Sequence, residues 1–477
     1  MIKRDKLLLL PFMLALSGLS FVLRVREIHM DVFGDESLYY YLSKTLGIAP
    51  ASAKDLPHLW THVSVRPFMY LFYFPWAQFG FIPFRAVNIL VGSAVPCLIC
   101  ALGVRMRVNA YIAVCFAILA SVHPQFILYS VVTFPDMLAT ALLLGGLLAY
   151  YSKSTRWAAL LFCLSVLTKE AFAMFLVPLL VEGSIRFWKT REKSCIAPML
   201  GLAAVVITNG FELYVLHGPS QGWSSNRIGN DFYAAFLWSY WFIPFVLLLL
   251  LHKEYNVLTI SLGAPAFFYV WGHVMGKGVD AWYIIGPFSI ALFVVSVAVQ
   301  RAVDTLKAGA DAFGDELPLW LRIPRSLCAA AVLLCLIAAP VDSGWRKTNI
   351  EESIARLGKP WVMPGSGNIA RAAAVLKGLK PENLLVMDVF WGFSYYPFGL
   401  LGRHVDSMCS EENDNCRPNE SRLRDALARH THVIWAKKNL RWEKSLKPTL
   451  DSCLVYENLE FTIYAINETC RRQLGKA

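Results

Sequence analysis

Charged residues are scarce in this 477-residue chain: Asp, Glu, Lys and Arg make up 17% of it, whereas 56% is hydrophobic. A soluble protein of this length needs far more charge to cover its surface. The mean hydropathy is +0.47, and several apolar runs approach the roughly 20 residues that span a bilayer. The composition therefore excludes an ordinary soluble protein and predicts a polytopic α-helical membrane protein.

Other signals are missing as well. The sequence contains no internal repeat, heptad run or low-complexity tract. Gly365-Ser366-Gly367 lacks both a preceding strand and a third glycine, so it is weak as a nucleotide-binding loop. The basic N-terminus and the apolar run Leu7–Leu23 resemble a signal peptide, but no small-residue cleavage site follows. We therefore expect a retained first helix.

The net charge of +11 is carried by short loops between apolar runs rather than by one soluble face. This distribution is typical of orientation by positive loops, and it disfavours a nucleic-acid partner. About eleven spans are predicted, near Leu7–Leu23, Phe84–Val104, Ala110–Val122, Met137–Tyr151, Trp157–Leu167, Phe172–Ile185, Ile196–Leu216, Tyr233–Leu251, Val257–Met275, Tyr283–Val299 and Leu327–Val341.

Loop charges predict a cytoplasmic N-terminus. The loops that then lie inside hold most of the Lys and Arg residues, whereas the outer loops after the first hold little beyond Lys169, Arg227 and Lys277. The C-terminus is predicted outside, as is the long first loop, in which the aromatic stretch Phe68–Phe81 reads as a helix lying on the membrane surface. The predicted location is a plasma, inner or endoplasmic reticulum membrane.

Two domains are expected. Residues 1–341 form a transmembrane module, with residues 24–83 as its first outer loop, and residues 342–477 form a small extracytoplasmic α/β domain. The second domain holds four cysteines, an even set suited to an oxidising compartment, and two glycosylation sequons. Its strand-like stretches are Leu384–Phe390, His432–Ala436 and Cys453–Ile466, and its helical stretches are Ile369–Lys377 and Ser421–Arg429.

Two adjacent carboxylates, Asp35 and Glu36, lie just beyond the first span. Carboxylates beside a bilayer are costly unless they face water or a polar cavity, so such a pair is a functional-site candidate. Sugar transfer to a hydroxyl needs a base for the proton, and a carboxylate is suited to that role. A phosphate leaving group departs as an anion and needs fixed positive charge instead.

The predicted outer face supplies both kinds of group. We take Asp35, Glu36 and Asp136 as catalytic candidates. The candidates for contact with substrate or phosphate are His62, Arg66, Lys169, Arg227, Lys277 and Tyr283. His58 and His62 would share one face of a helix, which permits a metal site, but two ligands are weak evidence and Pro57 opposes a long helix. The sequence names no certain cofactor.

Structural alternatives remain open for these residues. Asp35 could cap a helix that starts at Glu36 or Ser37, and Asp136 could cap the span that follows it. Lys169 could extend to the surface or pair with Glu170. Arg66 could anchor to lipid headgroups. Tyr283 could stack on a sugar ring or belong to an interfacial aromatic belt.

Several short motifs occur in an order that resembles GT-C glycosyltransferases of the protein O-mannosyltransferase and aminoarabinose transferase group. They are Gly34-Asp35-Glu36-Ser37, Arg66-Pro67-Phe68, Phe84-Arg85-Ala86-Val87-Asn88, Phe134-Pro135-Asp136-Met137, Leu167-Thr168-Lys169-Glu170, and Trp282-Tyr283 followed by Pro287. Arg66 replaces the usual lysine, Phe68 the second proline, and Trp282 a common arginine.

The resemblance implies an inverting transfer from a polyprenyl-phosphate or dolichyl-phosphate sugar to a protein, lipid or glycan acceptor on the extracytoplasmic face. It implies that Asp35 is the base, that Glu36 and Asp136 assist acceptor or site geometry, and that Arg66 and Lys169 hold the lipid phosphate. Some relatives bind a divalent metal near this site and others need none. The C-terminal domain resembles a small outer domain of some members.

Two other functions compete with this one. A lipid-linked sugar transporter or flippase also needs many spans, but the sequence has no inverted repeat, and its polar residues gather at one face. The second alternative is a non-enzymatic scaffold that presents the C-terminal domain.

The predicted topology can be checked by labelling. A single cysteine introduced at Asp55, in a chain whose other exposed thiols have been blocked, should react with a membrane-impermeant maleimide added to intact cells. A cysteine at Arg156 should react only after permeabilisation. Protection of the Asp55 position in intact cells would contradict the orientation, the donor and the resemblance together.

Overall fold

The computed structural model describes residues 2–29, 34–46, 63–211, 244–263, 285–308, 327–332, 367–387, 406–407, 420–436, 450–458 and 461–476. The chain divides into two compact units. The first comprises Met1–Arg26, Ser64–Met69 and Asn88–Lys359, and the second comprises Glu27–Val63, Tyr70–Val87 and Pro360–Ala477. Helices α4 and α5 each contribute to both units.

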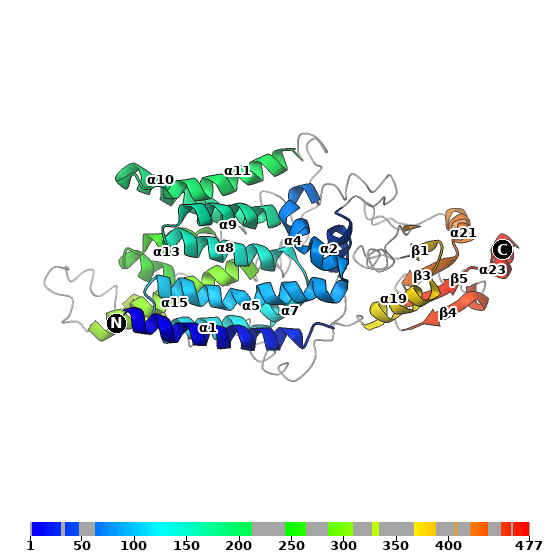
Figure 1. Ribbon diagram of the computed structural model, residues 1–477, viewed down its shortest axis with the longest axis horizontal. Helices are drawn as coiled ribbons and strands as arrows, with labels where there is room; N and C mark the ends of the chain where they lie inside the picture. The colour runs from blue at the N-terminus through cyan, green and yellow to red at the C-terminus, as the bar shows by residue number, and fades with distance from the viewer. Residues whose placement is uncertain are drawn as a thin grey trace. The chain divides into compact units, whose positions relative to one another are not determined.

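The first unit is a bundle of helices (Figure 1). In chain order they are α1 (Ile2–Val25), the larger part of α5 (Phe81–Arg105), α6 (Ala110–Val122), α7 (Pro124–Val131), α8 (Pro135–Tyr151), α9 (Thr155–Thr168), η1 (Glu170–Phe172), α10 (Ala173–Thr190), η2 (Lys193–Cys195), α11 (Ile196–Phe211), α13 (Tyr255–Ser261) and α15 (Ile285–Ala308).

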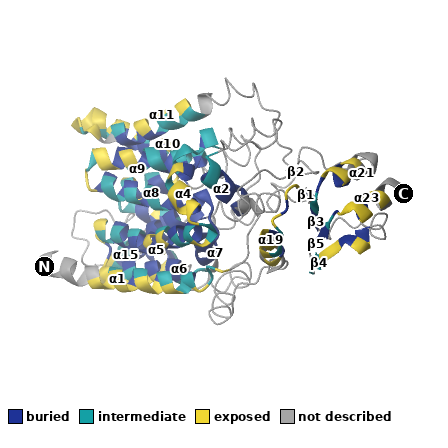
Figure 2. Cartoon of the chain, turned by 45° about the vertical axis from the view of Figure 1, so that its right-hand side comes forward, coloured by how far each residue is buried: buried dark blue, intermediate teal, exposed yellow. Residues whose placement is uncertain are grey.

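The helical content and the apolar faces fit a membrane protein. Among the described residues, three helices are long and apolar enough to cross a bilayer: Phe81–Arg105, Glu170–Thr190 and Ile285–Lys307. Shorter apolar helices accompany them, at Pro11–Val25, Ala110–Val122, Pro135–Tyr151, Thr155–Thr168 and Ile196–Thr208. The helices carry exposed apolar residues on their outer faces (Figure 2). The total of about eleven spans and the orientation stay predictions.

Most of the predicted helix positions are confirmed where the structure describes them, α6 with the same bounds. Two expectations were wrong. The stretch His123–Pro135, which the predicted spans Ala110–Val122 and Met137–Tyr151 leave as a link, contains helix α7, because a proline opens it and its apolar side chains are buried. The last long helix, α15, continues to Ala308 rather than ending at Val299.

Small residues let the bundle helices approach closely. A Cβ at Gly146 of α8 would lie 2.5 Å from Cδ1 of Phe162 on α9, and a Cβ at Gly92 of α5 would overlap Ser130 of α7. The α5–α7 contact is reinforced by Asn88, whose side-chain amide donates to the backbone carbonyls of Tyr129, Ser130 and Val132 at 2.8–3.2 Å. These bonds satisfy carbonyls at the C-terminal end of α7.

The second unit contains α2 (Gly34–Thr45), most of α4 (Pro67–Gln78) and the first turns of α5. An aromatic cluster joins these helices: the ring of Tyr40 lies 5.2 Å from Phe81 and 5.3 Å from Phe84, and Tyr73 lies 5.2 Å from Phe84. Helix α4 has one buried face and one exposed face; its expected position on the membrane surface stays a prediction.

The same unit contains a five-stranded mixed sheet, ordered β2-β1-β3-β5-β4. β1 (Leu384–Met387) is parallel to β2 (Asp406–Ser407) and to β3 (His432–Ala436). β5 (Phe461–Ala465) is antiparallel to both β3 and β4 (Leu454–Glu457). The helices are α19 (Gly367–Leu379), α21 (Glu420–Arg429) and α23 (Glu468–Lys476). The predicted α/β content of this region is confirmed, and its boundary at residue 342 lies outside the described residues.

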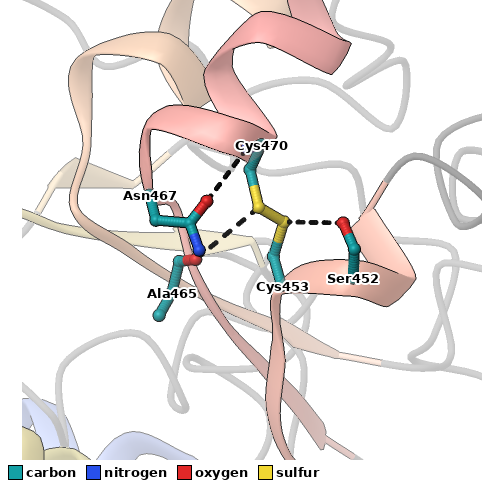
Figure 3. The surroundings of a disulfide bond; sticks show 5 residues. All are labelled: Ser452, Cys453, Ala465, Asn467 and Cys470. Carbon is teal, nitrogen blue, oxygen red and sulfur yellow. Dashed lines mark hydrogen bonds between the residues drawn. A yellow bond between two sulfur atoms is a disulfide. The ribbon is translucent and has the colours of Figure 1, made fainter.

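One correction concerns Cys453–Ile466. It was expected as a single strand-like stretch, but it is a hairpin of β4 and β5, because Asn458 accepts the amide of Phe461 in the turn at 2.7 Å. A disulfide joins Cys453, just before β4, to Cys470 on α23 (Figure 3). Asn467 accepts the backbone N–H of Cys470 at 3.0 Å, which fixes the start of that helix. Cys409 and Cys416 lie outside the described residues.

The close contact of α5 with α7 gives a direct test. Gly92→Ala should lower the stability of the solubilised protein by about 1–3 kcal/mol, because the added methyl must displace Ser130. Gly18→Ala on α1 is the matched control: nothing lies within 4 Å of its Cβ position, so the change should be neutral or stabilising by up to about 1 kcal/mol. Equal melting temperatures for the two variants would contradict this packing.

Candidate functional site

The acidic motif opens helix α2. The side chain of Glu36 is fully buried and forms a bidentate ion pair with Arg85 of α5. The distance from Nε of Arg85 to Oε1 of Glu36 is 2.8 Å, and the distance from Nη2 to Oε2 is 2.6 Å. The guanidinium also lies 4.5 Å from the ring centroid of Phe81. A bidentate pair matches the planar geometries of the guanidinium and the carboxylate, and it is stronger than an ion pair with a single hydrogen bond. Both carboxylate oxygens of Glu36 are therefore engaged by Arg85.

Arg85 fixes the chain on both sides of Asp35. Besides pairing with Glu36, it donates from Nη1 to the backbone carbonyl of Ile28 at 3.1 Å. Helix α2 begins at Gly34, so Asp35 lies in its first turn rather than capping a helix that starts after it. The side chain of Asp35 lies outside the described part of the structure.

A second ion pair lies in the first unit. Lys169 follows the last residue of α9, and its Nζ lies 2.8 Å from Oδ2 of Asp136, in the first turn of α8. Both side chains are at most 2% exposed. Lys169 therefore does not extend to the surface. Asp136 does not act as the cap of α8 either, because the N-cap is Phe134 and no side-chain cap bond forms.

A third pair lies beside the second. Arg66, directly before α4, donates from Nε and Nη2 to the two carboxylate oxygens of Glu170, both at 3.0 Å. The pair is about nine-tenths buried, with 13% and 10% of the two side chains exposed. Arg66 is thus turned toward protein rather than toward lipid headgroups, and Glu170 pairs with Arg66 instead of with its neighbour Lys169.

Together these residues form a buried charge cluster at the break between α9 and α10, which we call the Lys169 cluster: Arg66, Asp136, Lys169 and Glu170. Arg66 is near enough to act electrostatically on both Asp136 and Lys169. The cluster has two cations and two anions, so its formal charge is zero. One polar atom is left over: within the described structure, Oδ1 of Asp136 is buried and accepts no hydrogen bond.

Four predicted residues cannot be placed. His62, Arg227, Lys277 and Tyr283 lie outside the described residues. In the described part of the chain, no group of three or more His, Cys, Asp or Glu side chains gathers in a manner that could hold a metal ion. The structure thus places Glu36, Arg66, Asp136 and Lys169, and it adds Arg85 and Glu170 as their partners.

Solved structures resemble this chain, although no family model and no curated protein sequence matches it. ArnT from Cupriavidus metallidurans in the apo state has a TM-score of 0.56 at 14% identity, covering 98% of this chain and 99% of that chain. ArnT bound to undecaprenyl phosphate gives 0.54 at 14%, covering 97% and 98%. The Archaeoglobus fulgidus oligosaccharyltransferase AglB, in complex with an inhibitory peptide and a dolichol-phosphate, gives 0.52 at 12%, covering 93% and 71%.

The chain has the GT-C fold. The resemblance inferred from the ordered motifs is thereby confirmed at the level of the fold. The similarity extends over nearly the whole chain, and one of the similar structures is an aminoarabinose transferase. At 12–14% identity the likeness concerns the GT-C fold alone. The roles of individual residues rest on the geometry described above.

Only part of this set of charged partners could be predicted from the sequence. Arg85 was noted in a motif but was not counted as a site residue, and Glu170 was considered as a partner for Lys169 rather than for Arg66. A signal for both existed: each is a charged residue placed within or beside an apolar helix, where an ionised group needs a partner. Which residue supplies that partner depends on helices far apart in the chain.

The buried pair of the Lys169 cluster should respond strongly to removal of one partner. Asp136→Ala should cost about 3–5 kcal/mol of stability, because it leaves the charge of Lys169 buried and uncompensated. The double variant Asp136→Leu with Lys169→Met should recover most of that loss, since no charge is left buried. Melting temperatures of the solubilised proteins measure both effects.

The control is Glu192→Ala, which breaks the exposed Lys153–Glu192 pair, in which the two side chains are 75% and 37% exposed. It should cost less than about 1 kcal/mol. A double variant no more stable than Asp136→Ala alone would show that the Asp136–Lys169 ion pair is not what makes the single change costly.

Proposed function

We propose that this protein is an inverting glycosyltransferase that moves a sugar from a polyprenyl- or dolichyl-phosphate donor to an acceptor on the extracytoplasmic face of a membrane. The observation that carries the proposal is the GT-C fold along the whole chain, combined with an acidic motif at the start of α2. ArnT binds undecaprenyl phosphate and AglB binds a dolichol-phosphate and a peptide. These ligands support a lipid-linked donor in general terms.

The chemistry follows from the donor. An acceptor hydroxyl oxygen attacks the anomeric carbon of the sugar from the side opposite the lipid phosphate. The new C–O bond forms as the bond to the phosphate oxygen breaks, so the configuration at that carbon is inverted. The acceptor proton passes to the carboxylate of Asp35, and the lipid phosphate leaves as an anion without needing a proton.

The ion pairs give Glu36 a supporting role. Its carboxylate is buried and bound on both oxygens by Arg85, so it is not available to accept a substrate proton. It acts instead by fixing the first turn of α2, on which Asp35 lies. Rigid placement of a base within hydrogen-bond reach of the reacting hydroxyl is a large part of its effect.

The Lys169 cluster supplies positive charge for the phosphate. Arg66 and Lys169 are each neutralised by a carboxylate in the absence of substrate. A phosphate that reaches them competes with Glu170 and Asp136 for the same donors, and it binds through charge-assisted hydrogen bonds. His62, Arg227, Lys277 and Tyr283 remain further proposed contacts on the strength of the sequence. Asp136, with one oxygen unbonded, is able to accept a hydrogen bond from a sugar or acceptor hydroxyl.

Replacement of the base tests the proposal. Purified full-length protein in lipid nanodiscs, supplied with radiolabelled polyprenyl-phosphate hexoses and a membrane extract as acceptor source, should release polyprenyl phosphate and form labelled product. Asp35→Asn should lower this rate by about 10²–10⁴-fold, because the proton then has no base. The melting temperature should change little.

The matched control is Asp304→Asn, an Asp-to-Asn change on α15 whose side chain is 47% exposed; it should keep full activity. Full activity in Asp35→Asn would eliminate the proposed base. Movement of the lipid-linked sugar across liposomes without any covalent product, in the wild type, would replace the transferase by a transporter.

A further inference from the structure

One pattern in the sequence takes no part in the proposed sugar transfer. Among all the asparagines of the chain, only Asn419 and Asn467 begin an Asn-x-Ser/Thr sequence, the acceptor pattern for N-linked glycans. Both belong to the C-terminal α/β domain, which loop charges predict to lie outside the membrane. Asn419 lies outside the described residues, whereas Asn467-Glu468-Thr469 is described in full. Whether this second sequence can accept a glycan depends on its geometry.

The sequence Asn467-Glu468-Thr469 lies at the surface, where β5 is followed by α23. All three residues are exposed. The side chain of Glu468 is 86% exposed, and its Oε2 lies 3.6 Å from Nη2 of Arg472, whose side chain is 78% exposed. A glycan is bulky and hydrated, so only an exposed asparagine can carry one. Asn467 meets this first requirement.

The fold uses the oxygen of the Asn467 side-chain amide rather than its nitrogen. Oδ1 accepts the backbone N–H of Cys470 at 3.0 Å and thereby caps the start of α23 (Figure 3). The backbone of Asn467 is bonded as well: its N–H donates to the carbonyl of Ala465, and its carbonyl accepts the N–H of Arg471, both at 3.0 Å. Nδ2 donates to no acceptor in the part of the chain that the structure describes.

Nδ2 is the atom that carries the sugar in an N-linked glycan. When a sugar replaces one of its two hydrogens, the side-chain amide stays planar by resonance and keeps its carbonyl oxygen. The cap from Oδ1 to the N–H of Cys470 is therefore retained. The modification breaks no hydrogen bond of the described structure, because the atom to which the sugar is attached is the one that the fold leaves unused.

The neighbouring disulfide agrees with the compartment in which N-linked glycans occur. Thr469 is followed directly by Cys470, which is joined to Cys453 (Figure 3). Disulfides persist in oxidising environments, such as the lumen of the endoplasmic reticulum, the periplasm and the cell exterior. N-linked glycans are likewise carried by surface segments of secreted proteins. This is a second indication, separate from loop charge, that the acceptor sequence lies outside.

We propose that Asn467 is a modification site that carries an N-linked glycan on the outer side of the membrane. The donor is an oligosaccharide linked to a polyprenyl diphosphate, and a separate membrane enzyme makes the transfer. The bond between Nδ2 and the anomeric carbon forms as the bond from that carbon to the diphosphate oxygen breaks. Nδ2 gives up one proton to a base of that enzyme, and the diphosphate leaves as an anion. The proposal rests on the predicted side of the C-terminal domain and does not depend on the proposed sugar transfer by this protein.

Peptide mapping of the full-length protein, purified from the membranes of the cells that make it, tests the proposal. Mass spectrometry with electron-transfer fragmentation keeps glycans on their peptides and assigns them to single residues. Asn467 should carry an added mass made of whole sugar units. Asn458, which begins no acceptor sequence, should be unmodified in the same map and serves as the internal control.

Two substitutions remove the glycan without removing the helix cap. Thr469→Ala breaks the acceptor pattern and leaves Asn467 in place, and Asn467→Asp keeps a side-chain oxygen that caps a helix as well as asparagine does. Both should lose the glycan completely and keep the circular dichroism spectrum of the wild type. Thr469→Ser is the matched control: it retains the hydroxyl and should retain the glycan.

An unmodified Asn467 in the wild-type protein would overturn the proposal. A glycan on Asn467 that persists in Thr469→Ala would also overturn it, as would a sugar mass located on Thr469 in place of Asn467. If Thr469→Ala or Asn467→Asp does not fold, the wild-type map and Thr469→Ser still decide.

Discussion

The cost of burying charge in an apolar interior governs this structure. Ionised groups removed from water need partners with good geometry, and the described part of the chain meets that need with short ion pairs between helices. Arg85 and Glu36 connect α5 with α2, and Lys169 and Asp136 connect the end of α9 with the start of α8. In each case a charge on one apolar helix determines which helix must lie opposite it.

The same constraint links structure to the proposed chemistry. A lipid phosphate needs positive charge, yet an unpaired lysine or arginine would be unstable inside the bundle before the substrate arrives. The Lys169 cluster resolves this conflict, because Asp136 and Glu170 neutralise the two cations in the free protein. The consequence is an exchange of carboxylate for phosphate on binding, with little change in the net number of ion pairs. Tight binding of the phosphate group alone is therefore not expected, which suits a leaving group that must depart.

The sequence predicted the membrane class, the order of most helices and the α/β character of the C-terminal region. Those features follow from local patterns: apolar run length, loop charge and strand periodicity. It failed at His123–Pro135, where a link between two spans was expected in place of helix α7, and at Cys453–Ile466, where one strand was expected in place of a hairpin. Both errors concern short elements, whose formation depends on contacts with parts of the chain that are distant in sequence.

For the site, the sequence by itself determined which residues carry charge beside apolar helices, and the order of motifs was enough to indicate the GT-C fold. Only the tertiary structure decided the pairing: Glu36 with Arg85, Asp136 with Lys169, and Glu170 with Arg66 rather than with its neighbour. The physical reason is that an ion pair depends on the distance between side chains, and the partners here are separated by 33 to 104 positions along the chain. Helix packing, not sequence proximity, brings them within hydrogen-bond reach.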